Sequence, residues 1–111
     1  MRKQIEDNCA LITNSSNIKE DLCWNNYAKM CNIVNEHFYF LARKLQHTHA
    51  LNETEIRLCI LVLLGMSRAD ISQTLPYALN SIGKLKDHTA KSLGTTGKNL
   101  RDFLVKMAIE G

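Results

Sequence analysis

The clearest pattern of apolar and polar positions lies in the second half of the chain. Asn52 is followed three residues later by Glu55, a pairing typical of a capping box at a helix N-terminus. Residues 56–64 are then almost continuously apolar, and Gly65 follows where helices often end in a residue with positive φ. This order predicts a buried helix that begins near residue 52 and ends at the glycine.

Two further helices are predicted after that glycine. Ser67 repeats the capping signal and predicts a short helix up to about Leu75. A proline comes next, and because it lacks an N–H and disfavours helix in the residue before it, we expect a turn. A third helix is expected from about Leu79 to Leu93, with Gly94 as its stop. Two helices joined by a tight turn, the second one longer and basic, form the helix-turn-helix pattern.

The first 48 residues predict one short helix and one long helix. Apolar residues at helical spacing favour a short helix over residues 3–13, and a polar break follows at 14–17. From 18 to 46 apolar positions alternate three and four apart without a slip, which indicates one long amphipathic helix with a heptad seam. The seam residues are Trp24, Tyr27, Cys31, Val34, Phe38, Leu41 and Leu45.

This seam allows two interpretations. An apolar stripe at helical spacing is more often the core of a single bundle than a contact between chains. Its width nevertheless favours burial on two sides, one against the helix-turn-helix and one against a second copy. A homodimer with a globular helical interface is therefore expected, and the residues assigned to it are Trp24, Tyr27, Val34, Phe38, Leu41 and Leu45.

A last helix is predicted over residues 98–109, after a break at 95–97. Leu100, Phe103, Leu104 and Met107 lie on one face and should close the core beneath the helix-turn-helix. The expected fold is therefore all-α. Residues 49–111 form a helix-turn-helix domain of about four helices, and residues 1–48 supply the packing or dimerisation helices.

Composition agrees with one small globular domain. The chain has 111 residues, of which 45% are apolar and 23% charged, too apolar for a disordered chain and too short for two ordinary domains. A formal charge of +3 permits contact with nucleic acid but is mild. No apolar run of membrane-spanning length and no signal peptide is present, so a cytoplasmic protein without a membrane is expected.

Few side chains suggest catalysis or a cofactor. The acids are scattered and no glycine-rich phosphate loop occurs, so neither an enzyme nor a small-molecule substrate is indicated. His47 and His49 with a cysteine would match none of the usual zinc frames, and solvated histidines are expected instead. No metal or cofactor is therefore predicted. The cysteines form no C-x-x-C pair and are expected to be reduced and mostly buried: Cys9, Cys23, Cys31 and Cys59.

The third helix of the predicted unit is the candidate DNA-recognition helix. Ile82, Leu85, Thr89 and Leu93 face inward by spacing, which leaves a polar face outward with Lys86 at its flank. An α-helix fits the major groove, where outward side chains meet base edges and phosphates. The N-terminus of the short helix can contact a phosphate. The residues expected to contact double-stranded DNA are Ser67, Arg68, Asn80, Ser81, Lys84, Lys86, His88 and Lys91.

The same residues resemble the LuxR-type (GerE-like) bacterial DNA-binding domain, without a gap from Leu51 to Gly94. A narrower subgroup is more similar still, with Glu-x-Arg-Leu-Cys at 55–59, Asn-Leu-x-x-Phe-Leu at 99–104, and a preceding helix spaced as in 24–38. The resemblance implies a bacterial transcription regulator that binds DNA, often at the end of a longer chain. Matching positions include Leu51, Glu55, Leu58, Leu61, Val62, Gly65, Met66, Ser67, Ile71, Leu75, Ser81, Ile82, Leu93 and Gly94.

Two positions depart from this family. Gly83 stands where a basic residue is usual, and Asp87 stands at a second base-reading position that is commonly basic. Gly83 also weakens the helix by about 1 kcal/mol relative to alanine. These departures favour an alternative: a protein-interaction or dimerisation module derived from a helix-turn-helix, in which DNA binding has been lost.

Overall fold

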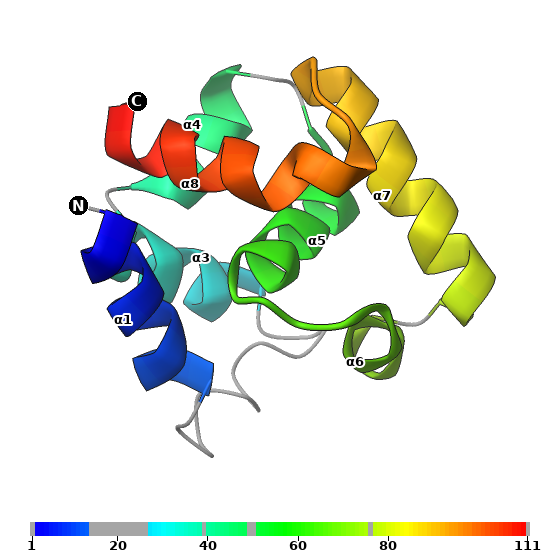
Figure 1. The fold of residues 1–111 in the computed structure, drawn as a ribbon, viewed down its shortest axis with the longest axis horizontal. Coiled ribbons are helices and arrows are strands. Elements are labelled where there is room, and N and C mark those ends of the chain that lie inside the picture. The colour runs from blue at the N-terminus through cyan, green and yellow to red at the C-terminus, as the bar shows by residue number, and fades with distance from the viewer. Residues whose placement is uncertain (1, 14–26, 39, 49–50, 76, 111) are drawn as a thin grey trace.

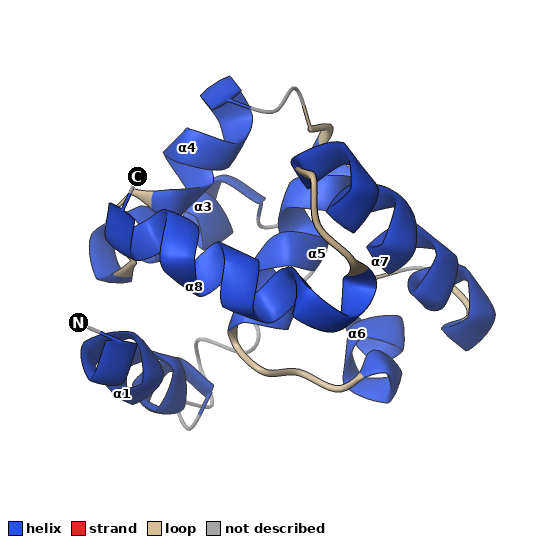
Figure 2. Cartoon of the chain, turned by 45° about the horizontal axis from the view of Figure 1, so that its top comes forward, coloured by secondary structure: helices blue, strands red, loops and turns tan. Residues whose placement is uncertain are grey.

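The structure, a computed structural model, describes residues 2–13, 27–38, 40–48, 51–75 and 77–110. Secondary structure in these residues is helical throughout, so the predicted all-α class is confirmed (Figure 2). None of the described helices is long and apolar enough to cross a membrane. In chain order the helices are α1 Arg2–Thr13, α3 Tyr27–His37, α4 Leu41–Thr48, α5 Glu53–Leu63, α6 Arg68–Thr74, α7 Leu79–Leu93, the 3-10 helix η1 Gly97–Asn99 and α8 Leu100–Glu110.

Helix α5 lies at the centre of the fold, in contact with α3, α4, α7 and α8 (Figure 1). Its N-terminus has the predicted capping box: the Glu55 amide donates to Asn52 Oδ1 at 2.8 Å, and the Asn52 amide donates to Glu55 Oε1 at 3.1 Å. Every residue from Glu55 to Leu63 is buried. Gly65 has φ of 82°, so the predicted end of this helix is confirmed.

Helices α6 and α7 also begin and end close to the residues that the sequence indicates. The Ser67 hydroxyl accepts from the Asp70 amide at 3.2 Å and caps α6. Helix α7 has the predicted bounds, and Gly94 ends it with φ of 84°. Pro76, the expected cause of the turn between the two helices, lies outside the described residues.

The single helix predicted over residues 18–46 is wrong from Tyr27 onward, and 18–26 lie outside the described residues. Helix α3 ends at His37, Phe40 adopts a left-handed conformation with φ of 62°, and α4 begins at Leu41. Both short helices contact α5 and each other. A straight helix would carry half of its apolar stripe away from α5, whereas the break lets both halves bury theirs. Asn8 Nδ2 donates to the last carbonyl of α3, His37 O, at 2.8 Å.

Because of this break, the apolar residues of the predicted seam are buried within the single chain. Val34, Phe38, Leu41 and Leu45 are almost completely buried in the hydrophobic core of this one chain. They leave no surface for a second copy to contact, so the single-bundle interpretation holds for these four residues. Tyr27 is partly buried, and Trp24 lies outside the described residues. A homodimer stays a prediction that must use other side chains.

Helix α1 is joined to the same core by an arginine of α8. Arg101 Nη1 and Nη2 donate to the two carboxylate oxygens of Glu6 at 3.0 and 3.2 Å. Its Nε donates to Leu63 O at 3.0 Å, near the C-terminus of α5, and the Cys9 thiol donates to the same carbonyl at 3.3 Å. Residues from both halves of the chain therefore share one core.

The cysteines of the described residues are buried thiols, as predicted. Burial raises the pKa of Cys9, Cys31 and Cys59, and for Cys59 it raises the pKa to about 12. Such a thiol is inert at neutral pH. Cys23 lies outside the described residues.

Candidate functional site

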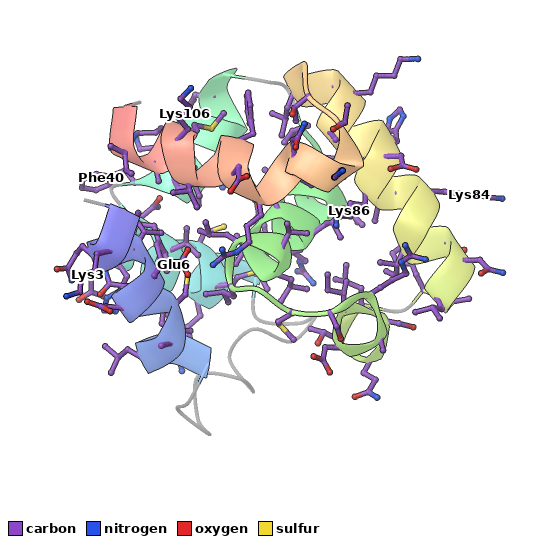
Figure 3. All side chains as sticks on the ribbon, viewed as in Figure 1. Lys3, Glu6, Phe40, Lys84, Lys86 and Lys106 are labelled. Atoms are coloured by element: carbon purple, nitrogen blue, oxygen red, sulfur yellow. The ribbon has the colours of Figure 1, made fainter. Side chains whose placement is uncertain are left out.

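Helix α7 presents the predicted polar face to solvent. Ile82, Thr89 and Leu93 are buried against the core, together with Ala90, and Leu85 is partly buried. Lys84 extends away from the body of the molecule on the outer side of α7 (Figure 3). The inward and outward positions that helical spacing predicts are therefore confirmed. The exposed residues of this face are Asn80, Ser81, Lys84, Asp87, His88 and Lys91.

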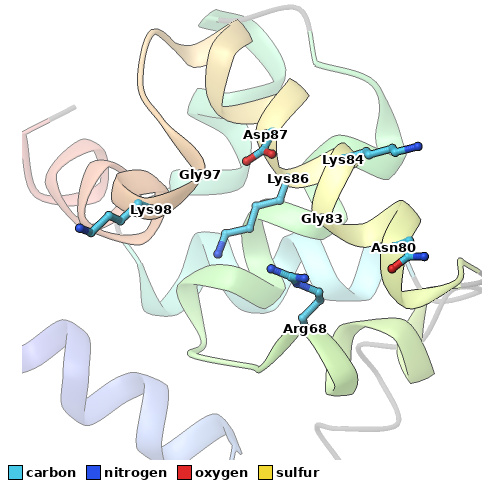
Figure 4. Close-up of a pocket in the computed structure, with 8 residues that line it drawn as sticks. All are labelled: Arg68, Asn80, Gly83, Lys84, Lys86, Asp87, Gly97 and Lys98. Carbon is cyan, nitrogen blue, oxygen red and sulfur yellow. The ribbon is translucent and has the colours of Figure 1, made fainter.

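A groove of about 490 Å³ runs beside this face, where α6, α7 and η1 meet (Figure 4). Four basic side chains line it and a single acid faces them, so the charge of the lining is strongly positive. A groove of this sign attracts and concentrates anions. Its lining residues are Arg68, Asn80, Gly83, Lys84, Lys86, Asp87, Gly97 and Lys98.

The guanidinium of Arg68 lies against α7 where Gly83 has no side chain. A Cβ placed on Gly83 would be 3.7 Å from both Cζ and Nη1 of Arg68, which is ordinary van der Waals distance. Any longer side chain at position 83 would occupy the space of the guanidinium. Although α7 lacks a basic residue at this position, α6 supplies a cation beside it. Lys86 extends from α7 toward the same space (Figure 4).

Asp87, the acid of the groove, lies against the start of η1. A Cβ placed on Gly97 would overlap its carboxylate oxygen Oδ1, so the glycine makes room for this side chain. The amides of a helix N-terminus carry partial positive charge, and a carboxylate beside them is favourable. Asp87 therefore packs at the corner between α7 and η1, and it lowers the positive charge of the groove.

His88 lies on the far side of the α7 face, next to α5. Its Nε2 is 3.8 Å from Glu55 Oε2, the carboxylate that also closes the capping box of α5. The His88 side chain is 73% exposed, so it stays accessible from solvent. The Glu55 carboxylate beside it repels anions, which weakens His88 as an anion contact.

The connection between α6 and α7 presents apolar side chains at the start of α7. Tyr77 is 39% exposed and Leu79 is 47% exposed. The backbone is held by two hydrogen bonds: Tyr77 N donates to Leu75 O at 2.8 Å, and Ser72 Oγ donates to Tyr77 O at 2.9 Å. Ala78 precedes α7 and provides no side-chain cap.

The structure thus brings together half of the residues predicted to contact DNA. Arg68, Asn80, Lys84 and Lys86 line the groove, whereas Ser81, His88 and Lys91 lie elsewhere on α7. Ser67 is exposed, but its hydroxyl is engaged as the cap of α6. Lys98 was missed because it follows a break in the predicted pattern, and only packing of η1 against α7 brings it to the groove.

No cluster of three or more potential metal ligands occurs in the described part of the chain. His47 is exposed, and His49 lies outside the described residues. Comparison of the chain with family models, with curated proteins and with solved structures finds no match.

Proposed function

We propose that this chain binds double-stranded DNA through α7, as the helix-turn-helix domain of a cytoplasmic bacterial transcription regulator of LuxR type. The observation that carries the proposal is the pairing of an exposed polar helix face with a basic groove along its edge. A helix of this kind enters the major groove, and the phosphates that border the major groove then lie beside it.

The shape of the α6–α7 unit supports this placement. Helix α7 has 15 residues, which corresponds to about 22 Å of helix, and only its inner side is buried. Helix α6 is short, contacts α7 and lies at the edge of the molecule (Figure 1). Within the described residues the outer face of α7 is exposed.

The charges of the groove supply the affinity. Arg68 and Lys86 extend toward one another in the groove, and Lys84 and Lys98 line it with their ammonium groups turned outward on either side (Figure 4). Each phosphate that these cations neutralise releases condensed counterions from DNA. Four such contacts predict that log K falls with log salt with a slope of roughly −3 to −4. Arg68 takes the place of the basic residue that Gly83 lacks, so the departure from the family at position 83 does not remove the cation.

Binding of a fluorescent mixed-sequence duplex, measured by anisotropy at rising salt, tests the proposal. Lys84→Ala and Lys98→Ala should each weaken binding and make the slope shallower by about 0.9. Lys3→Ala is the matched control, because Lys3 is an exposed lysine on α1, on the opposite side of the molecule from α7 (Figure 3). If all three variants behaved alike, α7 would not be the DNA-binding surface.

Two-fold dimerisation is part of the proposal, because helix-turn-helix domains commonly bind paired half-sites. The contact must use exposed side chains, since Val34, Phe38, Leu41 and Leu45 are buried. Sedimentation of the free chain and of its complex with one or two half-sites measures the stoichiometry. A chain that assembles but binds no duplex even at low salt would instead support the alternative of a protein-interaction module.

A further inference from the structure

We propose that the start of α7 reads A·T base pairs, by contact with thymine methyl groups and with the edge of adenine. This inference rests on the proposed DNA binding and adds which base pairs the surface prefers. It is carried by the side chains of the α6–α7 connection and the first turn of α7.

Two large apolar side chains are uncovered at this point. Within the described residues Tyr77 and Leu79 are among the few large apolar side chains that remain exposed, and they flank a single residue, Ala78. Two hydrogen bonds fix the backbone of Tyr77: Tyr77 N donates to Leu75 O, and Ser72 Oγ donates to Tyr77 O. In the major groove the apolar group that base edges offer is the C5-methyl of thymine. Apolar side chains held outward at this point therefore match thymine.

Asn80 and Ser81 follow directly and are exposed. An asparagine amide pairs with adenine by donating to N7 and accepting from N6, whereas serine pairs with several bases. The N-terminal residues of a recognition helix are the ones that contact base edges. Asn80 on the outer face therefore matches adenine, and Leu79, about 100° from it around the helix axis, is an exposed apolar side chain of the same turn that can contact a thymine methyl group.

Arginine is absent from α7, so guanine could be recognised only by lysine. Arginine and lysine are the side chains that bind guanine at O6 and N7, and the lysines of α7 are Lys84, Lys86 and Lys91. The guanidinium of Arg68 lies against Gly83, at the edge of α7. Lys84 lines the same groove and extends to the outer side of α7, about one turn beyond Asn80 (Figure 3). Lys91 lies about 16 Å along α7 from Asn80. It is therefore far from the first turn of the helix, which is the part placed against the base edges.

Competition between duplexes of equal length and different base composition tests the inference. An A·T-rich duplex should compete better than a G·C-rich duplex for the same labelled mixed-sequence probe. A second A·T-rich duplex carries uracil in place of thymine, which removes only the methyl groups. A third carries 7-deazaadenine, which removes the N7 acceptor. The chain variants are Leu79→Ala and Asn80→Ala, with Leu11→Ala as control, because Leu11 is a leucine of α1 that is 63% exposed.

Replacing thymine by uracil should weaken binding about fourfold for each methyl group in contact. Leu79→Ala should reduce this difference, leaving only the part that Tyr77 supplies, and Leu11→Ala should preserve it. Removing adenine N7 should weaken binding about fivefold or more in the parent chain and have no further effect in Asn80→Ala.

Three outcomes would overturn the inference. Equal competition by A·T-rich and G·C-rich duplexes would leave DNA binding intact and remove the base preference. An A·T preference unchanged by uracil and by Leu79→Ala would reflect duplex shape rather than contact with the bases. No binding of the mixed-sequence probe at low salt would remove the proposed function itself.

Discussion

Replacing Gly83 by alanine should stabilise the protein. Gly83 is the fifth residue of α7, well inside the helix, where glycine costs about 0.8 to 1.0 kcal/mol relative to alanine. The added Cβ would stand 3.7 Å from the Arg68 guanidinium, an ordinary contact, so little of this gain is lost to crowding. For 111 residues the entropy of unfolding is roughly 0.23 kcal/mol/K, which converts the gain into a rise in Tm of about 4 °C.

Thermal and urea denaturation, each followed by far-UV circular dichroism, measure this effect. Gly94→Ala is the matched comparison, because Gly94 ends the same helix with φ of 84° and its added Cβ would meet nothing within 4 Å. Alanine there adopts a left-handed conformation at a cost of about 1 to 2 kcal/mol, so its Tm should fall. The two substitutions are chemically identical and opposite in sign because only the backbone conformation differs.

A larger residue at position 83 separates helix propensity from the groove. Gly83→Gln should keep most of the gain in helix propensity, because glutamine is also a good helix former, but its side chain must displace the Arg68 guanidinium. DNA affinity and its salt dependence should then fall as they do in Arg68→Ala. A lowered Tm in Gly83→Ala would show that the guanidinium packs more tightly on α7 than 3.7 Å implies, and would refute this account of the pair.

Three further predictions concern the core, the groove and the thiols. Phe38→Ala should lower the free energy of unfolding by about 3 to 5 kcal/mol in urea titrations, whatever the protein concentration, because Phe38 is buried in one chain rather than between two. Asp87→Asn should raise DNA affinity about two- to fivefold at low salt, measured by anisotropy, because it removes the acid of the groove and keeps its shape against Gly97. Burial raises the pKa of Cys59 from 9.0 to about 12, so the unfolded chain loses this proton first, and stability should fall by up to about 1.4 kcal/mol per pH unit as pH rises between these values. Cys59→Ala should remove that part of the pH dependence in denaturation curves.

The helices at 53–63, 68–74 and 79–93 could be predicted because their ends are encoded locally. Asn52 and Ser67 accept the hydrogen bonds that their residue types suggest, and Gly65 and Gly94 adopt the positive φ that glycine permits. Each signal involves residues at most a few positions apart. Contacts elsewhere in the fold are not needed to interpret them.

The break between α3 and α4 has no such local signal. Phe40 adopts φ of 62°, a conformation that costs a residue with a Cβ about 1 to 2 kcal/mol and that is usually marked by glycine or asparagine. The cost is offset by burial of both short helices on α5. An unbroken seam of apolar residues arises equally from one long helix and from two short helices packed on a common partner. Spacing along the chain cannot separate these cases.

The candidate site also has one part that the sequence predicts and one part that depends on the fold. Helical spacing correctly places Asn80, Lys84 and Lys91 on the outer face of α7, because that face depends only on which side of the helix is apolar. The groove depends on contacts between elements: α6 lays Arg68 over Gly83, and η1 brings Lys98 beside α7. A glycine that looks like the loss of a cation when α7 is considered alone is, in the folded chain, the space that a cation from another helix occupies. The charge of such a site is therefore the sum of the charges that all neighbouring elements contribute. A count of charges along one helix underestimates the positive charge of the site.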